Sequence, residues 1–299
     1  MRIFITGASG WIGSAVVPEL LNAGHQVVGL ARSDRSAAAL AAAGAEVRRG
    51  DLDDLDSLRT GAADSDGVIH LGYNHDFSRM ADAAQTDLAA ITTLAGALEG
   101  TDRPFIFASG VLGLAPGRVA TEQDQPAAGL HPRIANGQAA LSFVERGVRT
   151  IAVRFAPTVH GPGDHGFVAT LVGIAREKGV AAYIDEGGNR WPAVHRLDAA
   201  ALIRLALDGA PAGAALHATA EEGVPAREIA EAIGRGLGLP VVSLPADQAD
   251  AHFGWMGRFF SADTATSSVA TQELLGWKPV HPGLIADLDA GYYFKDGDS

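Results

Sequence analysis

The sequence contains no cysteine, which excludes disulfide bonds, thiolate-ligated metals and catalysis by a thiol. It also lacks an excess of positive charge. With 23 Lys and Arg against 35 Asp and Glu, its formal net charge is −12, which disfavours binding to nucleic acids or anionic membranes. The apolar run after Met1 and Arg2 ends at Gly7 and is too short for a signal-peptide core or a membrane span. We therefore expect a cytoplasmic protein.

Hydrophobic residues, at 47% of 299, are sufficient for a large core. Short apolar runs alternate with helix-length segments along the first half of the chain. This order predicts a parallel sheet with helices on both faces, an α/β doubly wound fold of the Rossmann type. The expected strands are residues 2–6, 26–31, 45–49, 67–71, 104–109 and 150–155, and the expected helices are 12–23, 35–43, 54–61, 77–99 and 134–146.

The alternation loosens after about residue 156. Loop-like stretches at 156–166, 185–195 and 243–268 lie between expected helices at 167–178, 197–208 and 225–236. This pattern indicates a small C-terminal substrate-binding lobe folded against the first part. We expect a nucleotide-binding domain over 1–160, completed by segments within 196–220, and a mainly substrate-binding lobe over 161–299.

A glycine-rich turn is the strongest local signal. In ITGASGWIGSA, the glycines Gly7, Gly10 and Gly13 lie between a strand and a helix. Glycines allow the backbone to turn tightly and approach a pyrophosphate, and the free N–H groups of the helix start attract its charge. A turn that is glycine-rich for structural reasons alone is the alternative.

The end of the second strand distinguishes the two nicotinamide dinucleotides. An acidic residue there would bind the ribose hydroxyl of NAD, whereas an arginine would accommodate the 2′-phosphate of NADP. The sequence reads LARSDR, so Arg32 follows the strand directly and Ser33 adds a donor. This order favours NADP. The alternative is that Arg32 is solvated and Asp34 binds the ribose of NAD.

With these residues the chain resembles the extended short-chain dehydrogenases/reductases, and further segments match in order over nearly its whole length. They are RRGDLDD, GVIHLG, FASG, VRFAPTVHGPGD, AVHRLDAAALI and LLGWKP. The resemblance implies that Asp51 and Leu52 hold adenine and that Ser109 occupies the position of the catalytic serine. The expected cofactor-binding residues are Gly7, Ser9, Gly10, Trp11, Ile12, Gly13, Arg32, Ser33, Asp51, Leu52, Leu71, Gly72, Ser109, Pro157 and Val159.

One motif of this family is absent. The tyrosine and lysine of its Y-x-x-x-K motif align with Arg133 and Gly137. In typical members the tyrosine donates a proton during hydride transfer and the lysine lowers its pKa. The chain therefore resembles the atypical branch, which includes reductases, isomerases and cofactor-binding regulators of the NmrA type.

Another group must then supply the proton, or water must. The candidate catalytic residues are Tyr73, Ser109, Arg133 and His160. Tyr73 and His160 could act as acids, Ser109 could bind a substrate oxygen, and Arg133 could stabilise an oxyanion. The alternatives are a turn-capping role for Ser109, a surface position for Arg133 and a structural role for the histidine. We expect no metal, because no two histidines have metal-binding helical spacing.

Aromatic and histidine side chains in the loops indicate a pocket for an apolar or ring-bearing substrate. The expected substrate-binding residues are His75, Phe77, Val111, His165, Trp191, His195, Phe253 and Trp255. Alternatively, the aromatic residues attach the lobe to the domain. We expect an NADP-dependent oxidoreductase for a small carbonyl compound or alcohol, as a monomer or homodimer without nucleic-acid or membrane partners. An epimerase, isomerase or dehydratase that retains its cofactor and a cofactor-sensing regulator remain the alternatives.

Overall fold

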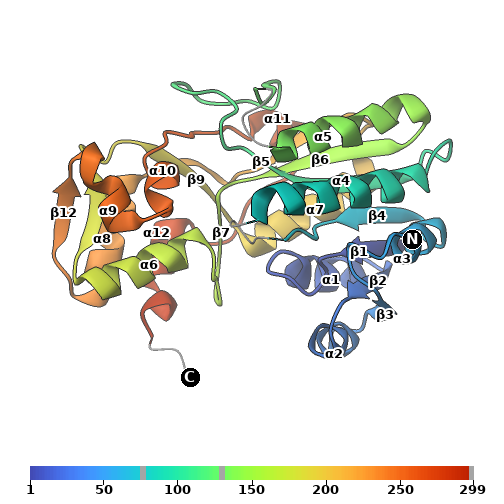
Figure 1. Cartoon of the computed structure of the whole chain (residues 1–299), viewed down its shortest axis with the longest axis horizontal. Coiled ribbons are helices and arrows are strands. Elements are labelled where there is room, and N and C mark those ends of the chain that lie inside the picture. The colour runs from blue at the N-terminus through green and yellow to red at the C-terminus, as the bar shows by residue number, and fades with distance from the viewer. Residues whose placement is uncertain (75–78, 128–131, 296–299) are drawn as a thin grey trace.

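The structure is a computed structural model of the chain and describes residues 1–74, 79–127 and 132–295. Its larger part is built on a seven-stranded sheet with the order β10-β6-β5-β4-β1-β2-β3, in which neighbouring strands are parallel (Figure 1). The doubly wound fold predicted from the sequence is thereby confirmed. The strands are β1 (Arg2–Thr6), β2 (Gln26–Ala31), β3 (Glu46–Arg49), β4 (Gly67–His70), β5 (Pro104–Gly110), β6 (Arg149–Phe155) and β10 (Ala215–Ala218).

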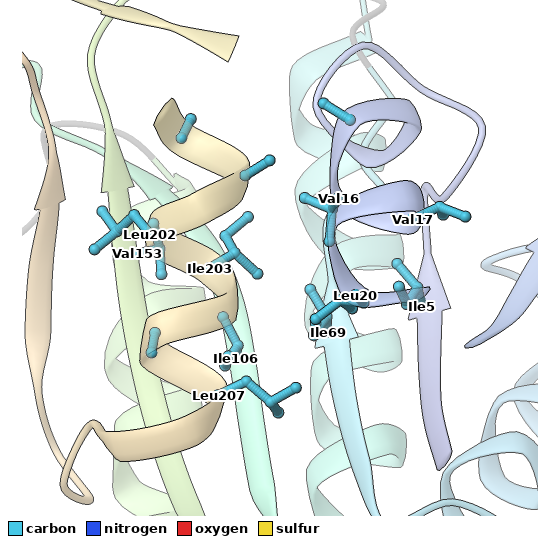
Figure 2. Packing of buried hydrophobic residues seen from close by; sticks show 14 of the residues in the cluster. Ile5, Val16, Val17, Leu20, Ile69, Ile106, Val153, Leu202, Ile203 and Leu207 are labelled. Carbon is cyan, nitrogen blue, oxygen red and sulfur yellow. The ribbon is translucent and has the colours of Figure 1, made fainter. Parts of the chain in front are cut away.

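Helices cover both faces of this sheet because successive side chains of a buried strand point to opposite sides. Ile3 and Ile5 of β1 pack in one apolar cluster with helices α1 and α7, whereas Phe4 packs in another with α3, α4 and α5. Figure 2 shows side chains of α1 and α7 against the strands on the first face. The helices are α1 (Gly13–Asn22), α2 (Asp34–Ala42), α3 (Leu55–Ala63), α4 (Met80–Gly96), α5 (Pro132–Ser142), α7 (Arg196–Gly209) and α11 (Val269–Leu275).

A smaller lobe lies beside the carboxyl ends of the main strands (Figure 1). Its sheets have the orders β11-β9-β7 and β12-β8, and a third apolar cluster fills it. Its strands are β7 (Thr158–His160), β8 (Ala181–Ile184), β9 (Arg190–His195), β11 (Glu221–Pro225) and β12 (Val241–Leu244). Its helices are α6 (Phe167–Lys178), α8 (Ala226–Leu237), α9 (Ala249–Phe253), α10 (Met256–Phe260) and α12 (Leu284–Asp289), with 3₁₀ turns η3 (Ala246–Gln248) and η4 (Tyr292–Phe294).

The expected elements of the first 155 residues are found with small shifts at their ends. The helix expected over 134–146 begins at Pro132 and ends as a 3₁₀ turn, η2 (Phe143–Arg146). The loops expected at 156–166, 185–195 and 243–268 were wrong in part. Strands β7 and β9 lie within the first two, and η3, α9 and α10 lie within the third. β7 has only three residues, and Pro192 interrupts the strand signal of β9.

Residues 196–218 leave the smaller lobe and rejoin the main sheet. Helix α7 covers one face of that sheet, and β10 extends it beside β6. The two lobes meet where β6 is followed by β7, at the carboxyl ends of the central strands.

Within the described residues, no helix is both long and apolar enough to cross a membrane.

Candidate functional site

The glycine-rich turn joins β1 to α1 and packs directly on the turn that follows β4. Gly7 has a φ of +68°, and a Cβ there would lie 2.6 Å from the backbone nitrogen of Gly72. A Cβ at Gly13 would lie 2.2 Å from the Gly7 carbonyl oxygen. Both glycines are therefore required for close contact between backbones.

Gly10 lies in different surroundings. A Cβ at Gly10 would have one described atom within 4 Å, the Gly7 carbonyl oxygen at 3.1 Å. Ser9 and Gly10 are exposed, and Ile12, the N-cap residue of α1, provides no side-chain hydrogen bond to the helix start. Apart from this one tight contact the protein leaves the space at Gly10 open, and α1 begins without a side-chain cap, so this part of the turn fits the close approach of a pyrophosphate.

Trp11 connects this turn to the smaller lobe. Its indole Nε1 donates a hydrogen bond to the Val159 carbonyl oxygen at 2.7 Å, and its ring meets His165 edge-on with 5.5 Å between centroids. Val159 lies in β7, and Pro157 precedes that strand. Trp11 thus holds the segment expected beside the nicotinamide against the glycine-rich turn.

The residues expected at the adenosine end lie at the ends of β2 and β3. Arg32 is exposed directly after β2, and the Ser33 hydroxyl caps α2 by accepting from the Ser36 backbone nitrogen at 3.2 Å. Asp34, the alternative ribose ligand, forms an ion pair with Arg49. The Arg32 side chain therefore remains available to a 2′-phosphate, while the competing carboxylate has a partner.

Asp51 and Leu52 follow β3 at the same edge of the sheet. One Asp51 carboxylate oxygen accepts from the backbone nitrogens of Asp53 and Asp54, at 2.9 and 3.0 Å. This fixes the loop before α3. Leu52 approaches the turn after β4, since its Cδ2 lies 3.2 Å from where a Gly72 Cβ would be. The loop expected to hold adenine thus borders the turn after β4, on which the glycine-rich turn packs.

Two of the four candidate catalytic residues are in contact, and a third, Ser109, follows a residue that Arg133 contacts. The Arg133 guanidinium carbon lies 4.1 Å from the centroid of the Tyr73 ring. Its Nη2 donates to the carbonyl oxygen of Ala108, the residue before Ser109, at 3.2 Å. Tyr73 follows β4, Ser109 lies near the end of β5 and Arg133 begins α5, so the fold itself places them at one edge of the sheet.

A buried polar network beneath these residues was not predicted from the sequence. The Thr6 hydroxyl contacts His70 Nδ1 at 2.7 Å, and His70 Nε2 lies 3.2 Å from Asp87 Oδ1. Asn136 Nδ2 donates to Asp87 Oδ2 at 2.7 Å. These four side chains are almost fully buried. The network joins the end of β1, through β4 and α4, to α5.

Asp87 also connects this network to Arg133, whose Nε lies 4.0 Å from Asp87 Oδ2. Burial would raise the pKa of Asp87, but the hydrogen bond and charge of His70, together with Arg133 and Asn136, hold it below its usual value. Burial raises the pKa of the Tyr73 phenol, and the charge of Arg133 acts in the opposite direction. Asp87 thus carries a negative charge that orients Arg133, while Tyr73 keeps its proton.

His160, the fourth catalytic candidate, lies elsewhere. It is fully buried in β7, and its Nδ1 donates to Asp287 Oδ2 of α12 at 2.6 Å. Its ring stands edge-on to that of His195, with 5.5 Å between centroids. His195 is also buried, and its Nδ1 accepts from the Leu197 backbone nitrogen at 3.2 Å. This placement does not favour His160 as a donor to a bound substrate.

The expected aromatic pocket residues separate into two groups. Trp191 and Phe253 are buried in the core of the smaller lobe, where both contact Phe260. Trp191 is 0% exposed, so it does not fit the expected role as a pocket wall. Trp255 is 49% exposed and joins Phe167 and Phe259 in an aromatic cluster at the lobe surface.

The remaining expected substrate-binding residues are dispersed. Val111 is buried with Leu114 and Ala120, and His165 is exposed beside Trp11. His75 and Phe77 lie outside the described residues. Across ranges 1–74, 79–127 and 132–295, no group of three or more His, Asp and Glu residues is arranged to hold a metal ion.

A doubly wound sheet, its glycine-rich first turn and an uncapped helix start define a dinucleotide-binding class of protein. More specifically, the chain belongs to the NAD dependent epimerase/dehydratase family, whose family model matches residues 3–217. An uncharacterised protein of Schizosaccharomyces pombe is 48% identical over 98% of this chain and 100% of its own length. A 2-alkyl-3-oxoalkanoate reductase of Stenotrophomonas maltophilia is 28% identical over 81% of this chain and 77% of that protein.

The fold is also similar to that of a solved UDP-glucose 4-epimerase from Thermus thermophilus in complex with NAD. The TM-score is 0.75 at 20% identity, and the match covers 98% of this chain and 99% of that one. At this identity the likeness supports the fold alone. The nicotinamide cofactor follows from the family and from the residues of the glycine-rich turn, which fit a dinucleotide.

Proposed function

We propose that the protein is an NADP-dependent oxidoreductase that transfers hydride between NADP(H) and a small apolar or aromatic carbonyl compound or alcohol. The contacts of Arg133 with the Tyr73 ring and with the carbonyl oxygen of the residue before Ser109 carry this proposal. The bound cofactor supplies or accepts the hydride. The protein must supply the proton and stabilise charge on the substrate oxygen.

Each of the three residues has a chemical role that its surroundings support. The Tyr73 phenol donates the proton to the carbonyl oxygen, and its raised pKa keeps it protonated near neutral pH. A protonated phenol suits reduction of a carbonyl substrate more than oxidation of an alcohol. Arg133 stabilises negative charge developing on that oxygen, because Asp87 and the Ala108 carbonyl orient its guanidinium. The Ser109 hydroxyl donates a further hydrogen bond to the same oxygen.

Two observations support the finer parts of the proposal. Arg32 is exposed after β2 while Asp34 is paired with Arg49, which favours the 2′-phosphate of NADP. Phe167 follows His165, which Trp11 contacts, and joins Trp255 and Phe259 in the surface cluster; these aromatic rings favour an apolar or ring-bearing substrate. A relative acting on 2-alkyl-3-oxoalkanoates adds support for carbonyl reduction.

A screen for NADPH consumption tests the proposal. Purified protein is mixed with NADPH and a panel of aromatic aldehydes, aromatic ketones, aliphatic 3-oxo acids and hydrophilic sugars. We expect NADPH oxidation with aromatic or aliphatic carbonyl compounds and little with sugars. Binding of NADPH without turnover on any compound would contradict the enzyme proposal and favour a cofactor-sensing regulator.

The family description favours a second candidate, an epimerase or dehydratase that retains its cofactor. This reaction would convert a substrate without net consumption of NADPH. Product analysis of the same panel, extended to nucleotide sugars, distinguishes the two candidates. A new sugar product at constant NADPH would favour the second candidate.

A further inference from the structure

Arg196 is an unusual arginine in this protein. Across the described ranges, it is the only arginine that is not exposed and that forms neither a hydrogen bond nor an ion pair. Its guanidinium carbon lies 4.3 Å from the centroid of the Trp11 ring, and this stacking is its main contact. Burial lowers the pKa of Arg196, which reflects the cost of holding this charge away from water.

The surroundings of Arg196 do not offset this cost. It is the first residue of α7, where the helix dipole disfavours a cation. The nearest acid along the chain, Asp198, accepts from the Val280 and His281 backbone nitrogens and from the His281 ring. In a protein with a net charge of −12, a half-buried guanidinium without a carboxylate partner indicates an anionic ligand.

The position of Arg196 identifies that ligand. Its side chain lies between Trp11, within the glycine-rich turn, and Gly161, where a Cβ would lie 3.2 Å from Arg196 Cγ. Helices α1 and α7 pack in one apolar cluster, and both begin at the carboxyl edge of the parallel sheet. Arg196 therefore lies beside the helix start where the proposed dinucleotide places its pyrophosphate.

We propose that Arg196 binds the pyrophosphate of the dinucleotide, with Trp11 as the platform that orients it. Stacking on the indole occupies the face of the guanidinium and leaves its N–H groups, which lie in the plane, for phosphate oxygens. The hydrogen bond from Trp11 to Val159 holds this platform in place. The inference deepens the proposed function, since it rests on cofactor binding at the glycine-rich turn.

Ligands with and without the pyrophosphate test this assignment. Arg196→Gln is titrated with NADPH, NADH, ADP-ribose and 2′-AMP, and the first three ligands contain the pyrophosphate. We expect affinity for these three to fall by a similar factor, about 10-fold to 100-fold, as expected for a lost charge-assisted contact. Affinity for 2′-AMP should stay at the wild-type value. Arg176→Gln, an exposed and unpaired arginine of α6, is the matched control and should bind all four ligands normally.

The outcomes separate this inference from the proposed function. If the wild-type protein binds no dinucleotide, the proposed function fails first and the inference fails with it. If the wild-type protein binds NADPH and Arg196→Gln binds it equally well, the inference alone is wrong. A raised KM for the carbonyl substrate in that variant would then assign Arg196 to the substrate. An equal loss of 2′-AMP binding would also overturn the inference, because 2′-AMP has no pyrophosphate.

Discussion

At the scale of single residues, the chain lacks the Y-x-x-x-K motif of the family it resembles, and an arginine and a tyrosine from separate segments are in contact instead. By the resemblance to extended short-chain dehydrogenases/reductases, we expect Arg133 and Gly137 at the positions of the motif's tyrosine and lysine. Arg133 cannot donate a proton near neutral pH, but it lies against Tyr73, a phenol from another segment. A guanidinium and a phenol are therefore in contact, although they come from segments 60 residues apart rather than from one helix.

Tyr73→Phe should lower kcat by roughly 10²-fold or more while cofactor affinity stays nearly intact, because only the proton donor is removed. Steady-state kinetics with NADPH and the best carbonyl substrate, together with NADPH titration, measure both quantities. Tyr183→Phe is the control. Tyr183 also lies beneath an arginine, Arg227, at 4.9 Å, but in the smaller lobe. A wild-type kcat for Tyr73→Phe would assign the proton to another group or to water.

Arg32→Ala should weaken binding of NADPH much more than that of NADH, because only NADPH has the 2′-phosphate. Arg35→Ala removes the same charge from the adjoining first turn of α2 and should have little effect on either ligand. Dissociation constants for both cofactors measure the difference. A wild-type preference for NADH, or equal weakening of both cofactors, would contradict the NADP assignment.

At the scale of secondary-structure elements, the junctions between strands and helices position the site. The turn from β1 to α1 contacts the turn after β4, and α5 carries Arg133 over the ends of β4 and β5. The parallel sheet brings these segments to one edge although they lie far apart in the sequence. Substitutions at these junctions should therefore distinguish packing from ligand binding.

Gly10→Val should abolish dinucleotide binding and leave the protein folded, since its Cβ would meet only the Gly7 carbonyl oxygen, at 3.1 Å, which a shift of a few tenths of an ångström relieves. Gly13→Ala should instead destabilise the fold, because its Cβ would lie 2.2 Å from the Gly7 carbonyl oxygen. Thermal unfolding and NADPH titration of both variants measure the contrast. Unchanged NADPH binding by Gly10→Val would show that this glycine has only a structural role.

Asp87→Asn should lower the free energy of unfolding at neutral pH by about 1–3 kcal/mol, because His70 and Arg133 lose a buried charged partner. The pKa of Asp87 is depressed in the folded protein, so its contribution is present above the unfolded-state value and is lost as pH falls through the folded-state value. The difference between wild type and variant should therefore shrink as the pH falls below 3.8, the ordinary pKa.

Denaturant unfolding at several pH values measures this difference. Asp82→Asn is the matched control, since Asp82 lies on the same helix in an exposed ion pair with Arg79. Its effect should be small at every pH. If the difference caused by Asp87→Asn does not depend on pH, Asp87 does not act as a buried carboxylate.

The sequence was sufficient to predict six of the seven strands of the main sheet, because apolar runs alternate with helices over the first 155 residues and the glycine turn identifies the first strand. The seventh strand, β10, was not predicted, because it has only four residues and follows the part of the chain where this alternation loosens. It did not reveal the network around Asp87, although a signal was present. Asp87 occupies the apolar stripe of α4, between buried residues Ala84 and Ala90. A charged residue in such a stripe requires partners, but those partners, His70 and Asn136, come from segments whose proximity depends on tertiary folding.

The same dependence on tertiary folding explains why Trp191 was expected in a pocket although it is buried. Trp191 lies within the loop expected at 185–195, and its aromatic character alone suits either a pocket or a core. Strand β9 turns it toward Phe167 and Phe260, within the core of the smaller lobe. Periodicity could not decide its burial, because β9 is short and contains Pro192.

At the scale of the whole molecule, separate apolar clusters fill the two parts of the chain, and polar contacts join them near the site. We continue to propose a division at residue 160, with residues 196–218 returning to the larger domain. Trp11 bonds to Val159 at this junction, and His160 bonds to Asp287 in α12. The His160–Asp287 pair therefore secures the carboxyl-terminal helix to the segment that leaves the main sheet.

This arrangement leads to a prediction that separates structure from catalysis. His160→Phe should lower the free energy of unfolding by about 1–3 kcal/mol, since Asp287 loses a buried hydrogen-bond donor. The kcat of the folded variant should remain close to wild type, because His160 is 0% exposed and pairs with Asp287 rather than with the Tyr73 site. A double-mutant cycle with Asp287→Asn, measured by denaturant unfolding, should show coupling between the two positions. A loss in kcat of roughly 10²-fold without a change in stability would instead make His160 the proton donor and displace Tyr73 from that role.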